Sequence, residues 1–329
     1  MHGAAKEDSY KKIRGNSYGM WIATEINLHH DNTIKEAFNR QLAAKRRKIF
    51  WDLNPDNPNA DIYTKYIDKY AKKHKEGTLL GGYNYKHFTI FDNINIPDLR
   101  KQEIISQYDE NSIWYLRDIL GKRCIAEGLC YRKFADKPEK YRISREEAKR
   151  KISQIIIGVD FGGNESGHAF IATGISRDFR DVIVLSSERH FGDIDPNDLG
   201  NLFVDFVLKI INLYGMPDIC YADSAEQTLI RGLRTSILNA NISLAIDNAW
   251  KSEINERIRA TNRLIGQMRL YLTEDCETLE TAFCSAVWNP KELTKDERLD
   301  DGSSDIDSLD AFEYTIERYI DLLILTEVV

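Results

Sequence analysis

The chain has 329 residues, enough for two domains of ordinary size, and 42% of its residues are apolar. It contains no run of roughly 18 apolar residues, which argues against a membrane span, and its first residues lack the apolar core of a secretory signal. The five cysteines are scattered without C-x-x-C pairs, which fits a reducing compartment and argues against a structural zinc site.

The net charge of −7 hides an asymmetry. Residues 1–150 hold 29 Lys and Arg against 21 Asp and Glu, whereas residues 151–329 hold 16 against 31. The first part could face an anionic partner, or both parts could be solvated surfaces of opposite sign. The second part is too acidic to bind a polyanion by bulk charge, so a nucleic-acid contact there would need local basic residues and metal ions.

The first half is predicted to alternate strands and helices. We expect strands at 18–26, 49–53 and 83–91, and helices at 30–44, 62–75, 99–109 and 111–122, with Asp31 as a possible N-cap. This alternation is typical of an α/β domain. The phosphate-binding motif G-x-x-x-x-G-K-[ST] occurs neither here nor elsewhere in the sequence. The charged stretch 133–151 is the best candidate for a linker.

The second half shows a separate pattern. Three strands joined by short turns are predicted at 154–161, 167–175 and 181–188, as in an antiparallel meander. A helix from Pro196 to about 214, a strand at 219–222, a helix at 225–240 and a strand at 242–246 follow. Helices at 252–268 and 276–287 and a final acidic helix complete the chain. This order predicts an α/β fold of the ribonuclease-H-like type.

Carboxylates mark the ends of two of these strands and the head of the final helix. Asp160 ends a buried β-branched strand, and Gly162 and Gly163 after it would let a backbone or ligand approach. Asp223 ends the strand at 219–222. Asp307 and Asp310 share one face of the final helix. Each could be an ordinary strand-end or first-turn acid, and Asp305 is better explained as a helix cap.

Taken together, these carboxylates predict a site for divalent metal ions. Mg²⁺ and Mn²⁺ prefer oxygen ligands, and two such ions roughly 4 Å apart can activate water and stabilise a phosphodiester transition state. Asp160, at the centre of the sheet, would bridge the ions. Lys251 could neutralise a DNA phosphate or be a surface lysine. Arg257, Arg259 and Arg263, in the helix at 252–268, could face DNA or lie on a solvated helix face.

At this point the residues match a known family. The whole chain resembles the large terminase subunit of tailed bacteriophages, which combines a DNA-packaging motor with a nuclease. In the second half, the segments similar to its nuclease motifs are 155–163, 221–225, 262–272 and 305–314. In the first half, the segments similar to the back part of its packaging ATPase are 18–30, 37–41, 50–58, 114–121 and 127–131.

The resemblance implies a domain organisation. Residues 1–132 would be the C-terminal part of the ATPase domain without its Walker A motif, 133–151 a linker, and 152–329 a ribonuclease-H-like nuclease. It further implies that Asp160, Asp223 and Asp310 bind two Mg²⁺ or Mn²⁺ ions. Asp307 stands where many relatives have His, and its carboxylate could also bind metal. Glu25 corresponds to the Walker B glutamate, although Thr24 replaces the Asp that usually precedes it.

The implied function is a metal-dependent endonuclease that cuts concatemeric double-stranded DNA during genome packaging in the cytoplasm of a bacterial host. The implied partners are DNA, a small terminase subunit, a portal protein and further copies in a ring. ATP would be used only if the P-loop is supplied elsewhere, so we expect no ATP hydrolysis by this chain alone. The alternatives are a resolvase or transposase of the same fold, and an inactive prophage remnant that only binds packaging partners.

Overall fold

The computed structural model describes residues 3–325 except 111, 163–165, 293 and 303. The chain divides into two compact units, one made of Met1–Ile94 and Leu116–Ile125, the other of Asn95–Tyr115 and Ala126–Val329. Every helix in the described ranges is too short or too polar to cross a bilayer.

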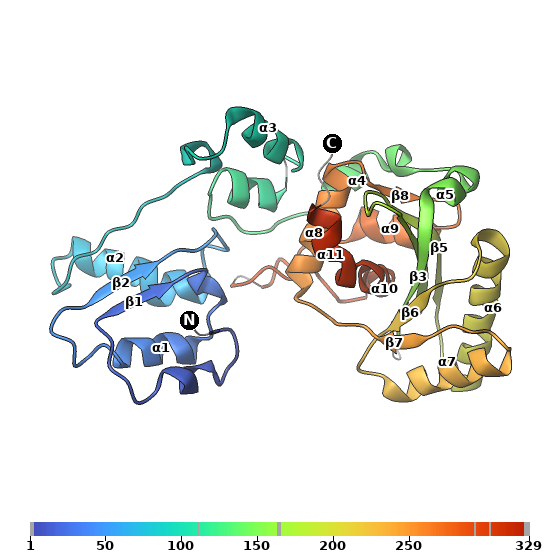
Figure 1. Ribbon diagram of the computed structural model, residues 1–329, viewed down its shortest axis with the longest axis horizontal. Helices are drawn as coiled ribbons and strands as arrows, with labels where there is room; N and C mark the ends of the chain where they lie inside the picture. The colour runs from blue at the N-terminus through green and yellow to red at the C-terminus, as the bar shows by residue number, and fades with distance from the viewer. Residues whose placement is uncertain (1–2, 111, 163–165, 293, 303, 326–329) are drawn as a thin grey trace. The chain divides into compact units, whose positions relative to one another are not determined.

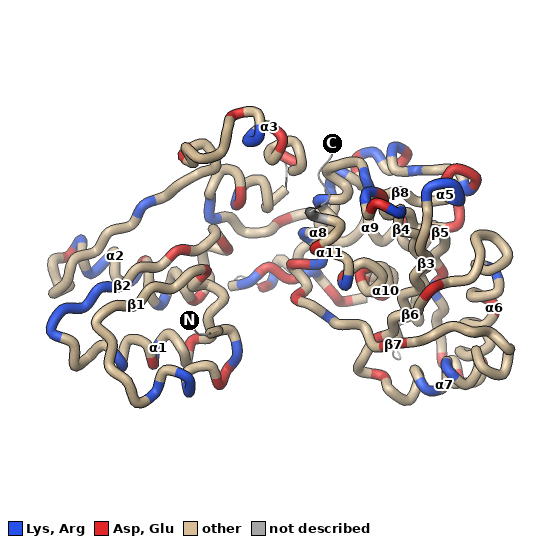
Figure 2. The backbone as a smooth tube through the Cα atoms, viewed as in Figure 1, with Lys and Arg blue, Asp and Glu red and all other residues tan. Residues whose placement is uncertain are grey.

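The first unit is built on two parallel strands, β1 (Met20–Ala23) and β2 (Lys48–Trp51), with Ile22 opposite Phe50. Its helices are α1 (Asp31–Asn39), α2 (Asp68–Lys75) and a π-helical turn at Ile62–Ile67 that runs into α2 (Figure 1). An unbroken basic run at residues 45–48 leads into β2 (Figure 2). The core contains four isoleucines, Ala23, Tyr63 and Tyr66, and partly buried aromatic side chains pack against it: Trp21, Phe38, Trp51 and Tyr70.

Two expectations for the first unit are wrong. Residues 83–89 form no strand and lead into a 3-10 turn at Ile90–Asp92, because their apolar side chains find no covering layer: Phe88 is 68% exposed. Asp31 is not the N-cap of α1. The ring of His30 accepts the hydrogen bond from the amide of Asn32, while Asp31 accepts one from the Tyr66 hydroxyl and pairs with Lys35.

The second unit holds a six-stranded mixed sheet in the order β7-β6-β3-β4-β5-β8. Its strands are β3 (Ile152–Asp160), β4 (His168–Ser176), β5 (Val182–His190), β6 (Ile219–Ala222), β7 (Ile246–Asn248) and β8 (Leu270–Leu272). The antiparallel meander β3-β4-β5 is confirmed, while β6, β7 and β8 run parallel to their neighbours. The sequence did not reveal β8, because three residues are too short to show alternation.

Helices cover both faces of this sheet. On one side lie α6 (Pro196–Tyr214) and α7 (Gln227–Asn239), and on the other α10 (Ile306–Ile316) crosses β3 and β4 with α9 (Glu277–Ser285) beside it (Figure 1). A 3-10 turn (Glu317–Tyr319) follows α10 and leads into α11 (Ile320–Leu325), which packs on α8 (Ile254–Gly266). The unit also includes α3 (Asp98–Ser106).

The segment 133–151, expected as a linker, is packed within the second unit. It spans most of α4 (Arg132–Asp136), a 3-10 turn (Pro138–Tyr141) and α5 (Arg145–Lys151). Phe134, Tyr141 and Ala148 are buried, and the Phe134 ring lies 5.0 Å from that of Phe283. The few apolar residues of this charged stretch therefore anchor it.

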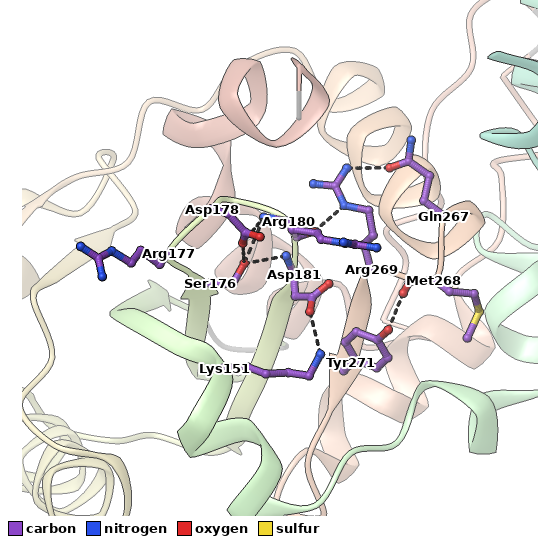
Figure 3. Close-up of a pocket in the computed structure, with 10 residues that line it drawn as sticks. All are labelled: Lys151, Ser176, Arg177, Asp178, Arg180, Asp181, Gln267, Met268, Arg269 and Tyr271. Carbon is purple, nitrogen blue, oxygen red and sulfur yellow. Dashed lines mark hydrogen bonds and ion pairs between the residues drawn. The ribbon is translucent and has the colours of Figure 1, made fainter. Parts of the chain in front are cut away.

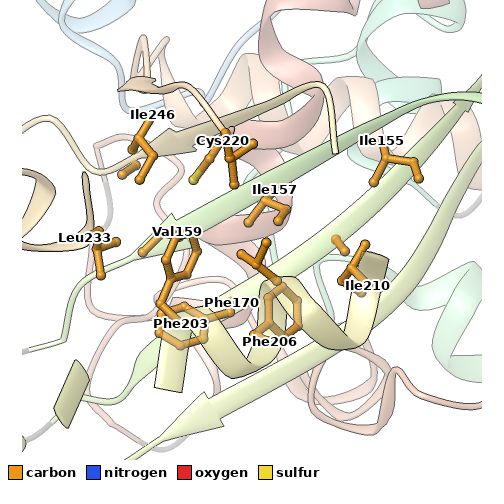
Figure 4. Close-up of a cluster of buried hydrophobic side chains, with 14 of the residues drawn as sticks. Ile155, Ile157, Val159, Phe170, Phe203, Phe206, Ile210, Cys220, Leu233 and Ile246 are labelled. Atoms are coloured by element: carbon orange, nitrogen blue, oxygen red, sulfur yellow. The ribbon is translucent and has the colours of Figure 1, made fainter. Parts of the chain in front are cut away.

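Strand β3 divides its residues between the two faces. Ile155, Ile157 and Val159 point into the apolar core against Phe203 and Phe206 of α6 (Figure 4). The alternate residues face α10, because successive side chains of a strand point to opposite sides.

Gly158 sets how closely α10 approaches. A Cβ atom at this position would lie 1.8 Å from the carbonyl oxygen of Ala311 in α10. The missing side chain lets the helix backbone rest directly on β3, two residues before Asp160. Gly162 similarly lets its own backbone pack on Ser166 and Gly167, while Gly163 lies outside the described residues.

Candidate active site

Asp160 and Asp223 lie side by side at one edge of the sheet. Val159 of β3 pairs with Ala222 of β6, and each is followed directly by one of the two aspartates. The Asp223 amide donates to the Val159 carbonyl at 3.0 Å. Both aspartates are only 8% exposed.

Helix α10 brings two more carboxylates to this edge. Burial raises the pKa of Asp160 well above its usual range, and the negative charges of Asp310, Asp223 and Asp307 raise it further. The Tyr314 hydroxyl, which donates to Asp160 at 3.1 Å, opposes this rise. The structure therefore places all four aspartates predicted from the sequence in one electrostatic cluster. Asp305, in contrast, caps α10 by accepting from the Ser308 amide at 2.9 Å, as expected.

Basic side chains turn toward these carboxylates. Lys251 Nζ lies 2.7 Å from Asp223 Oδ1, which also accepts from the Ala225 amide at 2.9 Å. Asp310 Oδ1 accepts from Arg257 at 3.2 Å and from Arg298 at 2.5 Å.

Asp307 is held in the same manner. Its Oδ2 accepts from the Gly167 amide at 2.8 Å and from Arg189 Nε at 2.9 Å. A common pattern results: in each of the four aspartates, one oxygen takes all the hydrogen bonds that described residues make, and the other oxygen takes none. Four oxygens are thus open to a ligand.

The types of donor atom fit a hard divalent cation, because the cluster offers carboxylate oxygens and no sulfur. Among the described residues, however, no group of three or more His, Cys, Asp or Glu is gathered closely enough to hold a metal ion. The ion pairs above supply the reason. Like charges repel, and Lys251, Arg189 and the pair Arg257 and Arg298 draw three of the carboxylates toward themselves. Metal binding would have to draw the open oxygens together.

A buried network of ion pairs holds the side chain of Asp310 in place. This network was not predicted from the sequence. Arg257 is 6% and Arg298 5% exposed, and both also bind the fully buried Glu313, at 3.0 and 2.8 Å. The Tyr131 hydroxyl donates to Glu313 at 2.9 Å. Both interpretations of Arg257, as DNA-facing or as a solvated helix face, are therefore wrong. Arg298 carried no signal, since it lies in a polar loop without periodicity.

Arg189 reaches the cluster from β5, in the same row of the sheet as Asp160. Asp160 pairs with Ala169, and Ala169 pairs with Arg189, so the three residues form one row across β3, β4 and β5. The small Ala169 leaves room between the charged residues that flank it. Counting outward from the turn between β4 and β5 would have placed Glu188 opposite Ala169, because the register shifts by one residue between Ala172 and Thr173. The predicted meander therefore could not place Arg189 in this row.

Glu25 lies in the first unit, two residues after the end of β1. It is exposed and adopts a left-handed conformation with φ of 50°, and its amide donates to Asp52 at 2.9 Å.

A cavity of about 720 Å³ opens at the other end of the sheet (Figure 3). Ser176, in its wall, pairs with Ile152 at the start of β3, whereas Asp160 ends that strand. Charged side chains that line the cavity have partners nearby. Lys151 pairs with Asp181 at 2.9 Å, and Arg269 donates to the Phe179 carbonyl at 2.8 Å. The cavity is therefore separate from the acidic cluster.

No protein-family model matches the sequence, and no curated protein is similar to it. Solved structures do match. The large terminase from a thermophilic bacteriophage aligns with a TM-score of 0.76 and 18% identity, over 96% of this chain and 72% of that one. The same protein in complex with ADP aligns with a TM-score of 0.74 and 18% identity, over 96% and 73%. The chain has the fold of a large terminase. The expected α/β fold and the likeness to a large terminase are thus confirmed over 96% of the chain, while the ribonuclease-H-like nuclease and the truncated ATPase domain stay predictions.

Proposed function

We propose that the second unit is a metal-dependent endonuclease for double-stranded DNA, with Asp160, Asp223, Asp307 and Asp310 as ligands of Mg²⁺ or Mn²⁺. The observation that carries this proposal is the acidic cluster itself: four aspartates from β3, β6 and α10, each with one oxygen open. The strand order β7-β6-β3-β4-β5, with only β4 antiparallel to its neighbours, supports a ribonuclease-H-like assignment.

Bound divalent ions would polarise the scissile phosphate and lower the pKa of an attacking water. Asp160 would hold the central position, oriented by the Tyr314 hydroxyl. Lys251 and Arg189 would add positive charge at opposite sides of the cluster, where the phosphates of DNA could bind. The acidic second half could then bind a polyanion locally despite its bulk charge.

The large-terminase fold supports a role in genome packaging. In this role the enzyme would cut concatemeric phage DNA in the host cytoplasm, together with a small terminase subunit, a portal protein and further copies in a ring. We assign the first unit to part of the packaging ATPase and the second unit to the nuclease, with 133–151 packed within it.

The first unit supports the view that ATP binding needs additional polypeptide. Met20, Ile22 and Phe50 lie on one face of the parallel pair β1 and β2, and they are 52%, 67% and 53% exposed. Parallel sheets are normally covered on both faces. Glu25 would orient a hydrolytic water only once a P-loop is present. We therefore expect no saturable ATP hydrolysis by the purified chain, and measurable turnover would contradict this.

The nuclease proposal is tested with supercoiled plasmid and purified chain. Mn²⁺ or Mg²⁺ should give nicked and linear products, and a chelator should stop the reaction. Asp160→Ala should lower the rate by about 10³-fold or more, because it removes the central ligand. Asp205→Asn, an exposed acid on α6, is the matched control and should cut normally. Equal cutting by Asp160→Ala and the wild type would rule out the site.

Two further measurements separate the alternatives. A clear preference for branched over linear duplex DNA, or strand transfer, would favour a resolvase or transposase. Absence of both Mn²⁺ binding in calorimetry and DNA cleavage would favour a remnant that only binds packaging partners.

A further inference from the structure

The loop that carries Lys251 is held by a single buried carboxylate. Glu317, 5% exposed, accepts hydrogen bonds from the amides of three successive residues: Trp250, Lys251 at 3.1 Å and Ser252 at 3.2 Å. The Ser252 hydroxyl adds a fourth bond at 3.3 Å. Successive amides that converge on one anion form a rigid concave turn.

The loop is also strained at the residue it presents. Lys251 has a φ of 53°, a left-handed conformation that is unfavourable for a side chain with a Cβ. Such conformations persist only when the surroundings impose them, and they cluster at functional sites. Here the bonds to Glu317 impose it.

Neighbouring contacts fix both ends of the loop. Arg318 donates to the Asn248 carbonyl at 3.0 Å and stacks over the Trp250 ring at 4.5 Å. Arg257, which binds Asp310, also donates to the Ser252 carbonyl at 3.1 Å. The loop is therefore tied to the same helical segment that carries Asp307 and Asp310.

We propose that Glu317 is a positioning residue, which holds the Lys251 ammonium beside Asp223 so that it can contact the phosphate to be cut. The proposal rests on the proposed nuclease function. Lys251 occupies only Oδ1 of Asp223, which leaves Oδ2 open, so the lysine and a metal ion can share this carboxylate. Its side chain is 38% exposed and is therefore accessible to a substrate.

Kinetics of plasmid cleavage test this role. Lys251→Gly removes the ammonium while glycine accepts the left-handed backbone, and kcat should fall about a hundredfold. Glu317→Gln keeps the shape but loses acceptors for the amides, and kcat should fall about tenfold with little change in KM. The double variant should match Lys251→Gly alone, because Glu317 acts through Lys251. Ser252→Ala, which removes only the hydroxyl bond, is the control and should remain close to the wild type.

A second readout does not depend on cleavage. The acetylation rate of Lys251 in the metal-free protein, measured by mass spectrometry, should rise several-fold in Glu317→Gln while the thermal midpoint stays near that of the wild type. An unchanged rate at Lys251, or losses in kcat that multiply in the double variant, would overturn the proposal. If the wild type cuts no DNA, the nuclease function fails, and the acetylation rates still decide whether Glu317 positions Lys251.

Discussion

The two faces of strand β3 differ in polarity: one packs against an apolar core, and the other carries a charged cluster. Ile155, Ile157 and Val159 enter an apolar core with α6 and α7, whereas Gly158 and Asp160 face α10 with its aspartates and their arginines. The first face gains free energy by burying apolar surface. The second holds like charges close together, which costs free energy. The comparison teaches that a strongly packed face lets the same strand carry an electrostatically unfavourable site.

The largest expected loss of stability comes from the apolar face. Phe206 on α6 is 1% exposed, and Phe206→Ala should cost about 3–5 kcal/mol because it leaves a cavity in the core. Folded protein should still bind Mn²⁺ normally. Leu208→Ala, at a 41% exposed position of the same helix, is the control and should change the free energy of unfolding by less than about 0.5 kcal/mol. Weakened Mn²⁺ binding in folded Phe206→Ala would show that the faces are not independent.

The second-largest expected loss of stability comes from the charged face of β3. Glu313→Gln leaves Arg257 and Arg298 in a buried site without their shared carboxylate, and should cost about 3 kcal/mol in chemical denaturation. It should also weaken Mn²⁺ binding, because the two arginines would redistribute onto Asp310. Glu297→Gln breaks an exposed pair with Lys295 and should cost less than about 1 kcal/mol. Similar losses in the two variants would mean that the network is not buried in solution.

Gly158→Ala tests the boundary between the faces. The new methyl group would collide with the Ala311 carbonyl, so α10 must shift, at a cost of about 1–3 kcal/mol. Because α10 carries Asp307 and Asp310, cleavage should fall further than stability alone explains. Gly232→Ala meets no atom within 4 Å on α7 and should be neutral or stabilising. Full cleavage activity in Gly158→Ala would contradict the role of this close contact.

The smallest effect concerns pH. The folded state raises the pKa of Asp160, so it retains a proton that the unfolded chain has already lost. This contribution is greatest below the unfolded pKa of about 4 and is lost as the pH rises through the folded pKa. The Tm of the metal-free wild type should therefore fall relative to that of Asp160→Asn as the pH rises from about 4 to neutral. Each kcal/mol lost from the free energy of unfolding should lower the Tm by about 2–4 °C. Parallel curves for the two proteins would contradict the proposed repulsion, and Asp205→Asn should follow the wild type.

Much of the second unit could be predicted because its signals are local. The β-branched run before Asp160, the apolar spacing of α7 and Pro196 at the start of α6 each mark an element directly. The four aspartates could be grouped because parallel strands end at one edge and Asp307 and Asp310 are three residues apart on a helix.

The counter-charges were harder to predict, because their positions depend on tertiary packing. Arg298 reaches Asp310 from a loop without a repeating pattern, and Arg257 is buried although its helix looks solvated. Glu317 could have been suspected, since it lies seven residues after Asp310 and so on the same helical face. In the first unit, residues 83–91 alternate like a strand, yet alternation alone does not supply a partner to pair with.

Helix α10 and the turn after it have a consequence for biosynthesis. They supply Asp307 and Asp310, the Tyr314 hydroxyl for Asp160, and the Glu317 carboxylate for the Lys251 loop. Because a chain emerges from the ribosome N-terminus first, a nascent chain contains Asp160, Asp223 and Lys251 long before any of these partners. The cluster can form only when the last helices have been made and have docked over Gly158. An unfinished chain would therefore lack the complete cluster on which the proposed nuclease activity depends.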